Sequence, residues 1–132
     1  MRVALLRAVG MATAAYGIAV TARPRLLAAP SGLTDEQGRT GEHTLISLRP
    51  VGVRDAASGL ALALAPEGPA LRTAALLRIA ADLSDAVLLG ATLPRPARAK
   101  AVAVSVGWGA LSLAALGTRP APAARKGRRF PR

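Results

Sequence analysis

Residues 3–22 read VALLRAVGMATAAYGIAVTA and are followed by Arg23-Pro24-Arg25. About 20 helical residues rise roughly 30 Å, which is the thickness of the hydrocarbon core of a bilayer. The stretch therefore predicts a helix long enough to cross a membrane. A secretory signal peptide is the alternative for this segment, with Val20-Thr21-Ala22 as its cleavage site, although Arg7 interrupts the apolar region.

Three more apolar stretches follow, at residues 45–65, 70–93 and 97–117. Their apolar residues recur with helical rather than alternating spacing, and the stretches are too long for strands. Pro50 lies inside the first of them and predicts a kink or a late helix start. Between residues 31 and 44 the chain is polar and predicts a loop, in which Ser31 or Thr34 would cap a short surface helix.

Four helices joined by short connections predict an all-α fold. The expected architecture is a four-helix transmembrane bundle with antiparallel up-down topology, formed by a single domain over residues 1–117. Residues 118–132 contain no acidic residue and are rich in Pro, Ala and Arg, which predicts a disordered basic tail. The basic residues of this tail are Arg119, Arg125, Lys126, Arg128, Arg129 and Arg132.

The composition excludes several classes of chemistry. The chain of 132 residues has no cysteine, which rules out disulfides, thiolate catalysis, zinc held by cysteines and iron–sulfur clusters. His43 is the one histidine and lies beside Glu42 in a loop, which is too few ligands for a metal site. No phosphate-binding loop or dinucleotide fingerprint occurs, and we predict neither a cofactor nor a metal.

Net charge and hydropathy separate along the chain. The chain is 52% hydrophobic and carries a formal net charge of +11. The interiors of the apolar stretches contain three positive and three negative side chains, whose charges cancel. The net charge therefore lies in the loops, the helix ends and the tail. This separation is typical of membrane proteins, because an unpaired charge inside a bilayer costs at least roughly 2.5–3.5 kcal/mol. The six internal charges are Arg7, Arg54, Asp55, Arg78, Asp82 and Asp85.

A soluble helical bundle is the alternative, since Ala-rich helices are only mildly hydrophobic. Such a bundle needs a broad polar face on every helix. The stretch at 101–116 offers little more than Ser105, Trp108 and Ser112 for that face. In the same stretch Ala101, Ser105 and Gly109 recur every four residues, and small residues at this spacing let helices approach closely within lipid.

The internal charges predict a polar network between the second and third stretches. Arg78, Asp82 and Asp85 share one helical face because they are spaced i, i+4 and i+7. In an antiparallel hairpin of the two stretches, Arg54 meets Asp82 or Asp85 while Arg78 meets Asp55. The network is then either structural or the lining of a polar cavity. Asp82 and Asp85 repel each other if both are ionised, and Arg7 could neutralise the second of them.

The run Gly52-Val53-Arg54-Asp55-x-x-x-Gly59, with Asp82 in the next helix, resembles a group of small integral membrane proteins, domain-of-unknown-function family 4267. The resemblance covers about residues 3–117. It implies a four-span fold with Arg54, Asp55 and Asp82 as characteristic positions, and it implies no activity.

The sequence therefore favours a small, non-enzymatic, multi-pass protein of the bacterial cell membrane that acts as an accessory or interaction subunit. The alternative is a transporter-like protein that moves protons or small solutes past Asp55, Asp82 and Asp85. An intramembrane enzyme with an aspartate as general acid or base is the third hypothesis, without a nucleophile or metal motif to accompany it.

The expected partners are the lipid bilayer, anionic lipid headgroups that bind the basic tail, and another membrane protein. Nucleic acid is disfavoured as a partner, because Phe130 is the one aromatic residue of the tail. Eight basic residues on the side of the termini, against six on the other side, favour cytoplasmic termini by the positive-inside rule.

Overall fold

The computed structural model describes residues 1–117, and within this range it contains helices and no strands. The prediction of an all-α fold is confirmed. The predicted basic tail, residues 118–132, lies outside the described residues. The helices are α1 (Val3–Ala22), α2 (Arg25–Ala28), α3 (Glu42–Leu64), α4 (Pro69–Thr92) and α5 (Arg95–Gly117).

Proline and glycine set several helix boundaries. Pro69 occupies the first turn of α4, where its missing N–H is not needed, and Gly68 precedes it with a positive φ of 105°. Pro50, by contrast, lies inside α3, which begins at Glu42. The expected late start of this helix is therefore wrong. The helix forms backbone hydrogen bonds ahead of Pro50, beginning with the bond from the Leu45 N–H to the Gly41 carbonyl. The proline therefore removes only one backbone N–H donor from the interior of the helix.

The short surface helix expected from Ser31 or Thr34 is also wrong. The short helix of this region is α2, which ends before Ser31. Farther along the loop, the Asp35 carboxylate accepts hydrogen bonds from the backbone N–H groups of Gln37 and Arg39. Local side-chain bonding of this kind competes with helix formation, which explains why this segment turns instead.

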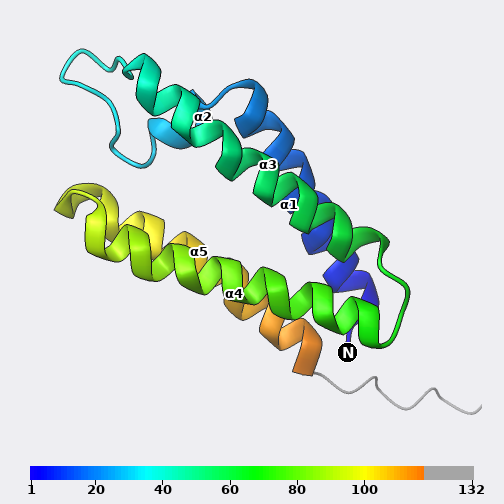
Figure 1. The fold of residues 1–132 in the computed structure, drawn as a ribbon. Coiled ribbons are helices and arrows are strands. Elements are labelled where there is room, and N and C mark those ends of the chain that lie inside the picture. Colours follow the sequence, from blue (N-terminus) through cyan, green and yellow to red (C-terminus); the bar gives the residue numbers. More distant parts are fainter. Residues whose placement is uncertain (118–132) are drawn as a thin grey trace, which may run out of the picture.

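The long helices form two antiparallel hairpins (Figure 1). One consists of α1 and α3, and the other of α4 and α5. The hairpins meet at the end that holds the N-terminus and the α3–α4 turn, and they diverge toward the other end (Figure 1). At the joined end, the backbone N–H of Arg2 donates to the carbonyl of Ala115 over 2.7 Å.

Glycine allows α1 and α3 to pack backbone to backbone. A Cβ added to Gly17 would lie 2.3 Å from the Ala56 nitrogen, and one added to Gly10 would lie 2.6 Å from the Ala63 nitrogen. Gly52 and Gly59 of α3 face α1 equally closely. Each helix thus carries two glycines seven residues apart, which is two helical turns, and they form one continuous seam.

The small residues of α5 lie on two faces of the helix, one that faces α4 and one that is exposed. A Cβ on Gly109 would lie 3.3 Å from the Cβ of Asp82, so the row of Ala101, Ser105 and Gly109 faces α4. A second pair of small residues in this helix, Ala103 and Gly107, is exposed, and a Cβ on Gly107 would meet nothing within 4 Å.

The main cluster of buried apolar side chains lies at the joined end of the two hairpins. Its fully or almost fully buried members come from all four long helices and are Leu6, Val9, Leu62, Leu71, Ala75 and Ala115. Many other large apolar side chains point outward, such as Leu64 (74% exposed) and Val87 (70% exposed), whereas Asp82 is 2% exposed. Beyond this cluster a few apolar residues such as Val20 and Leu93 are also buried, but many leucines and valines are exposed while Arg78 and Asp82 are buried.

Candidate functional site

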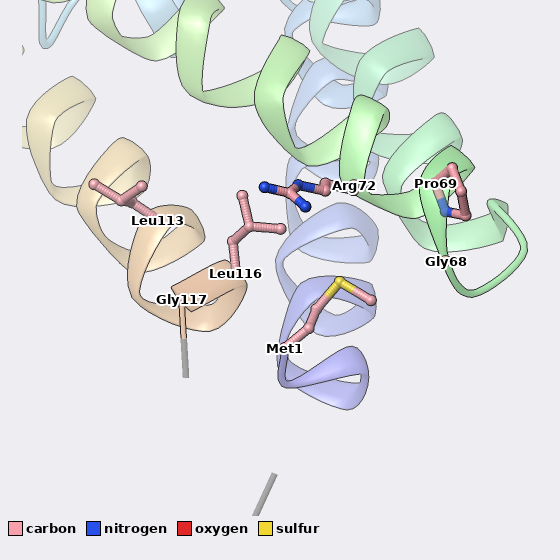
Figure 2. A pocket seen from close by; sticks show the side chains of 7 residues that line it. All are labelled: Met1, Gly68, Pro69, Arg72, Leu113, Leu116 and Gly117. Atoms are coloured by element: carbon pink, nitrogen blue, oxygen red, sulfur yellow. The ribbon is translucent and has the colours of Figure 1, made fainter. Parts of the chain in front are cut away.

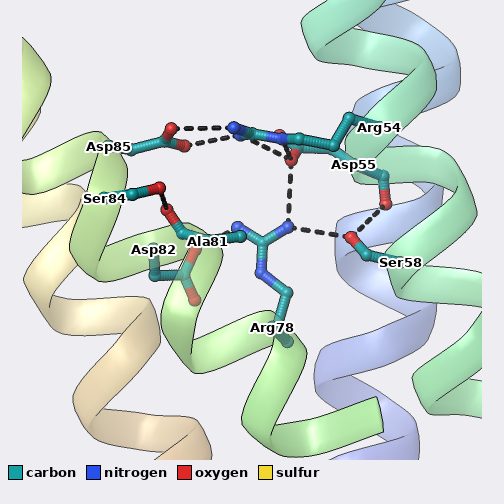
Figure 3. A network of polar contacts seen from close by, with 8 residues as sticks. All are labelled: Arg54, Asp55, Ser58, Arg78, Ala81, Asp82, Ser84 and Asp85. Carbon is teal, nitrogen blue, oxygen red and sulfur yellow. Dashed lines mark hydrogen bonds and ion pairs between the residues drawn. The ribbon is translucent and has the colours of Figure 1, made fainter.

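The site is a network of charged side chains between α3 and α4 (Figure 3). Successive residues of α3, Arg54 and Asp55, point toward α4 from the middle of the helix. The facing side of α4 supplies Arg78, Asp82 and Asp85, which the i, i+4, i+7 spacing places on one face. The structure brings together five of the six charged residues expected to form a network.

Arg54 and Asp85 form the outer part of the network. The Arg54 guanidinium donates from Nη1 to Asp85 Oδ1 over 2.9 Å and from Nη2 to Asp85 Oδ2 over 2.6 Å. This geometry is bidentate, the arrangement that gives arginine–carboxylate pairs their strength and direction. The same guanidinium also bonds Asp55 Oδ1, 3.0 Å from Nη2. The Arg54 side chain remains 40% exposed, so this part lies at the edge of the hairpin contact.

Arg78 forms the inner part and is 5% exposed. Its Nη1 donates to Asp55 Oδ1 over 3.0 Å, and its Nη2 donates to Asp82 Oδ1. Asp55 Oδ1 therefore accepts from both arginines and joins the two parts. The pairing of Arg78 with Asp55 is present as expected, and of the two partners expected for Arg54, Asp82 and Asp85, the structure shows Asp85.

Ser58 belongs to the network, although the sequence analysis did not include it. Its Oγ accepts a hydrogen bond from Arg78 Nη1 over 3.2 Å and donates to the Asp55 carbonyl. Its position one helical turn after Arg54 and Asp55 was the available signal, since residues at this spacing share a face.

Arg7 takes no part in the network. It lies exposed on α1, and its side chain makes no hydrogen bond or ion pair with the described residues. The expectation that it neutralises an aspartate is wrong, because α1 presents its glycine face to α3 and its Arg7 face outward. Two arginines and three aspartates remain, so the network carries one formal negative charge in excess.

The excess charge coincides with an unsatisfied acceptor. Among the described residues, Asp82 Oδ2 and Ser112 Oγ are buried side-chain atoms without a hydrogen-bond partner. A buried carboxylate oxygen without a donor costs free energy unless it binds a proton, a water molecule or a cation. The inner end of the network can therefore accept one further donor or positive charge.

The rest of the described chain offers less for chemistry. Within residues 1–117, no group of three His, Asp or Glu residues could hold a metal ion. A hollow at the joined end is lined by Met1, Leu113 and Leu116, and Arg72 is the single ionisable side chain among its described lining residues (Figure 2). Among the described helices, α1 and α5 are long and apolar enough to cross a membrane.

Comparison of the chain with protein-family models, with curated proteins and with solved structures finds no match.

Proposed function

We propose that the chain is a small multi-pass protein of the cell membrane whose four long helices cross the bilayer as an antiparallel bundle. The distribution of side chains supports this proposal most directly. Asp82 and Arg78 are buried, while large apolar residues such as Leu77 (66% exposed) and Val87 face the surroundings. This arrangement suits hydrocarbon, because lipid solvates leucine and valine and excludes unpaired charge.

The ion pairs account for the internal charges of α3 and α4. By comparison, α1 carries one internal charge, Arg7, and α5 carries none after Lys100. Each internal charge of α3 and α4 has a partner on the same or the facing helix. Pairing of this kind is how intramembrane charged residues are accommodated. In this proposal the network is structural, and the protein acts as a non-enzymatic accessory or interaction subunit for another membrane protein. Membership of the family of unknown function that it resembles is part of the same proposal.

The proposed topology places both termini in the cytoplasm. The bond between Arg2 and Ala115 holds the N-terminus beside the end of α5, so both lie at one end of the helices. The α3–α4 turn, with Glu67, lies at that end, and the loop with Gln37 lies at the other (Figure 1).

A cysteine-labelling experiment tests membrane insertion and topology together, and the absence of natural cysteines makes it direct. We expect an impermeant maleimide to label Gln37→Cys in spheroplasts, and to label Glu67→Cys only after permeabilisation. Both variants should stay in the pellet after alkaline carbonate extraction. Recovery in the soluble fraction contradicts the proposal, and the reversed labelling pattern contradicts the orientation.

Movement of protons or small solutes is a second candidate function, favoured by the unpaired Asp82 Oδ2. Intramembrane carboxylates that can gain and lose a proton are the usual carriers in proton relays. In proteoliposomes with a pH-sensitive dye inside, this function predicts proton flux that Asp82→Asn abolishes. Ser84→Ala, on the exposed side of α4, is the matched control and should conduct normally. Absence of flux with the wild-type protein contradicts this candidate and leaves the structural one.

A further inference from the structure

A second polar feature lies at the opposite end of α1 and α3 from the apolar core. There the end of α1, the short helix α2 and the first turns of α3 surround a depression of about 450 Å³. Three of its lining residues are arginines, Arg23, Arg25 and Arg49, and all three are exposed. The others are apolar: Ala22, Pro24, Leu26 and Leu45.

The positive charge of this depression is not neutralised within the described residues. None of its three arginines forms an ion pair in residues 1–117, in contrast to Arg54 and Arg78. Arg49 Nη1 donates to the Thr21 carbonyl over 3.0 Å, which fixes its guanidinium beside the end of α1. The remaining donors of this planar group are free for an anion.

The depression combines this charge with an apolar side. Leu26 is 47% exposed and, together with Leu45, lies next to the arginines. An inorganic anion makes no apolar contacts with such a surface. A phospholipid, in contrast, carries a phosphate and an acyl chain in one molecule and can contact both the arginines and the leucines. A helix of 20 residues spans about 30 Å, so in a bilayer the end of α1 lies at headgroup level.

We propose that this depression is a binding site for an anionic phospholipid. The phosphate binds between Arg23, Arg25 and Arg49, and an acyl chain follows the surface of Leu26 and Leu45. Basic pockets between helices at the membrane surface bind lipid headgroups by the same physics. The site lies in the leaflet opposite the N-terminus and the end of α5, and its residues are different from those of the basic tail. This inference rests on the proposed membrane function.

Native mass spectrometry of the full chain in detergent, with phosphatidylglycerol or phosphatidylcholine added, tests the site. We expect the wild-type protein to retain one phosphatidylglycerol in preference to phosphatidylcholine. The triple variant R23Q/R25Q/R49Q should bind phosphatidylglycerol roughly 100-fold more weakly, about fivefold for each arginine removed. The double variant R23Q/R25Q keeps the bond from Arg49 to Thr21 and should still lose roughly 25-fold.

The matched control is R95Q/R98Q/K100Q, which removes three basic residues at the same end of the molecule. Arg98 also donates to a main-chain carbonyl, that of Leu93, so the control loses a comparable bond. We expect its phosphatidylglycerol binding to stay at the wild-type level.

Three outcomes overturn the inference. They are equal binding by the wild type and the double variant, an equal loss in the control, and displacement of phosphatidylglycerol by inorganic phosphate as effective as by the lipid itself. The labelling and extraction experiment is independent of these results. A chain that stays in the membrane and shows no lipid preference contradicts the lipid site alone, whereas a soluble chain contradicts the proposed function.

Discussion

Replacing Gly17 by alanine is expected to lower the free energy of unfolding by about 3 kcal/mol. The added methyl group would lie 2.3 Å from the Ala56 nitrogen and 2.6 Å from the Gly52 carbonyl oxygen. Both are backbone atoms, so no side chain can rotate away, and α1 and α3 must separate along the seam. Thermal unfolding in detergent, followed by circular dichroism, measures the loss.

Gly107→Ala is the control for this substitution. The two glycines lie in the interior of long helices, but a Cβ on Gly107 meets no atom within 4 Å. Because alanine is the better helix former, the control should raise the free energy of unfolding by roughly 0.5–1 kcal/mol. Opposite signs for the same substitution are the expected result. Equal effects at both positions would show that α1 and α3 are not in backbone contact.

Replacing Arg78 by methionine is expected to cost about 3–5 kcal/mol of stability, because it leaves a buried charge without its partner. Asp82 bonds to Arg78 and to no other described residue. Asp55 retains Arg54, so the loss falls on the inner part of the network. Thermal unfolding in the same detergent checks this value.

Two further variants separate charge from packing. Arg72→Met, on an exposed turn of the same helix, should change stability by no more than about 0.5 kcal/mol. The double variant R78M/D82L removes both charges and should recover much of the loss, since apolar replacement of a buried pair is often neutral. A single variant as stable as the wild type would contradict the importance of the inner pair.

The sequence predicted those features that depend on helix-ending residues and on the helical spacing of side chains. The bounds of α1 agree with the prediction, because Arg23-Pro24 stops the apolar run after Ala22. The helical period and the antiparallel hairpin predicted that Arg54 pairs with Asp82 or Asp85, and the structure shows Asp85 as the partner. Of the two alternatives predicted from Pro50, the late helix start was wrong, because α3 begins at Glu42 and its first turn forms backbone bonds ahead of the proline.

The contact between α1 and α3 was not predicted. In a chain rich in alanine, rows of small residues occur on many helix faces, and the row predicted to pack lay in α5. The distinguishing signal was the recurrence of glycine after seven residues in both helices, at Gly10 and Gly17 and again at Gly52 and Gly59. The divergence of the two hairpins (Figure 1) was also beyond the sequence, since apolar stretches alone do not tell how helices are spaced.

The division of charge between α3 and α4 has a consequence for biogenesis. The three internal charges of α4, Arg78, Asp82 and Asp85, would cost roughly 8–10 kcal/mol if this helix entered the bilayer alone and none of them were paired. Arg54 and Asp55 arrive on the preceding helix, and a turn of four residues, 65–68, joins the two. The free-energy cost of inserting α3 and α4 together is therefore lower than the cost of inserting α4 alone. In the proposed membrane topology, α4 is therefore expected to insert as a hairpin with α3, with Arg78 and Asp85 paired to the charges of α3.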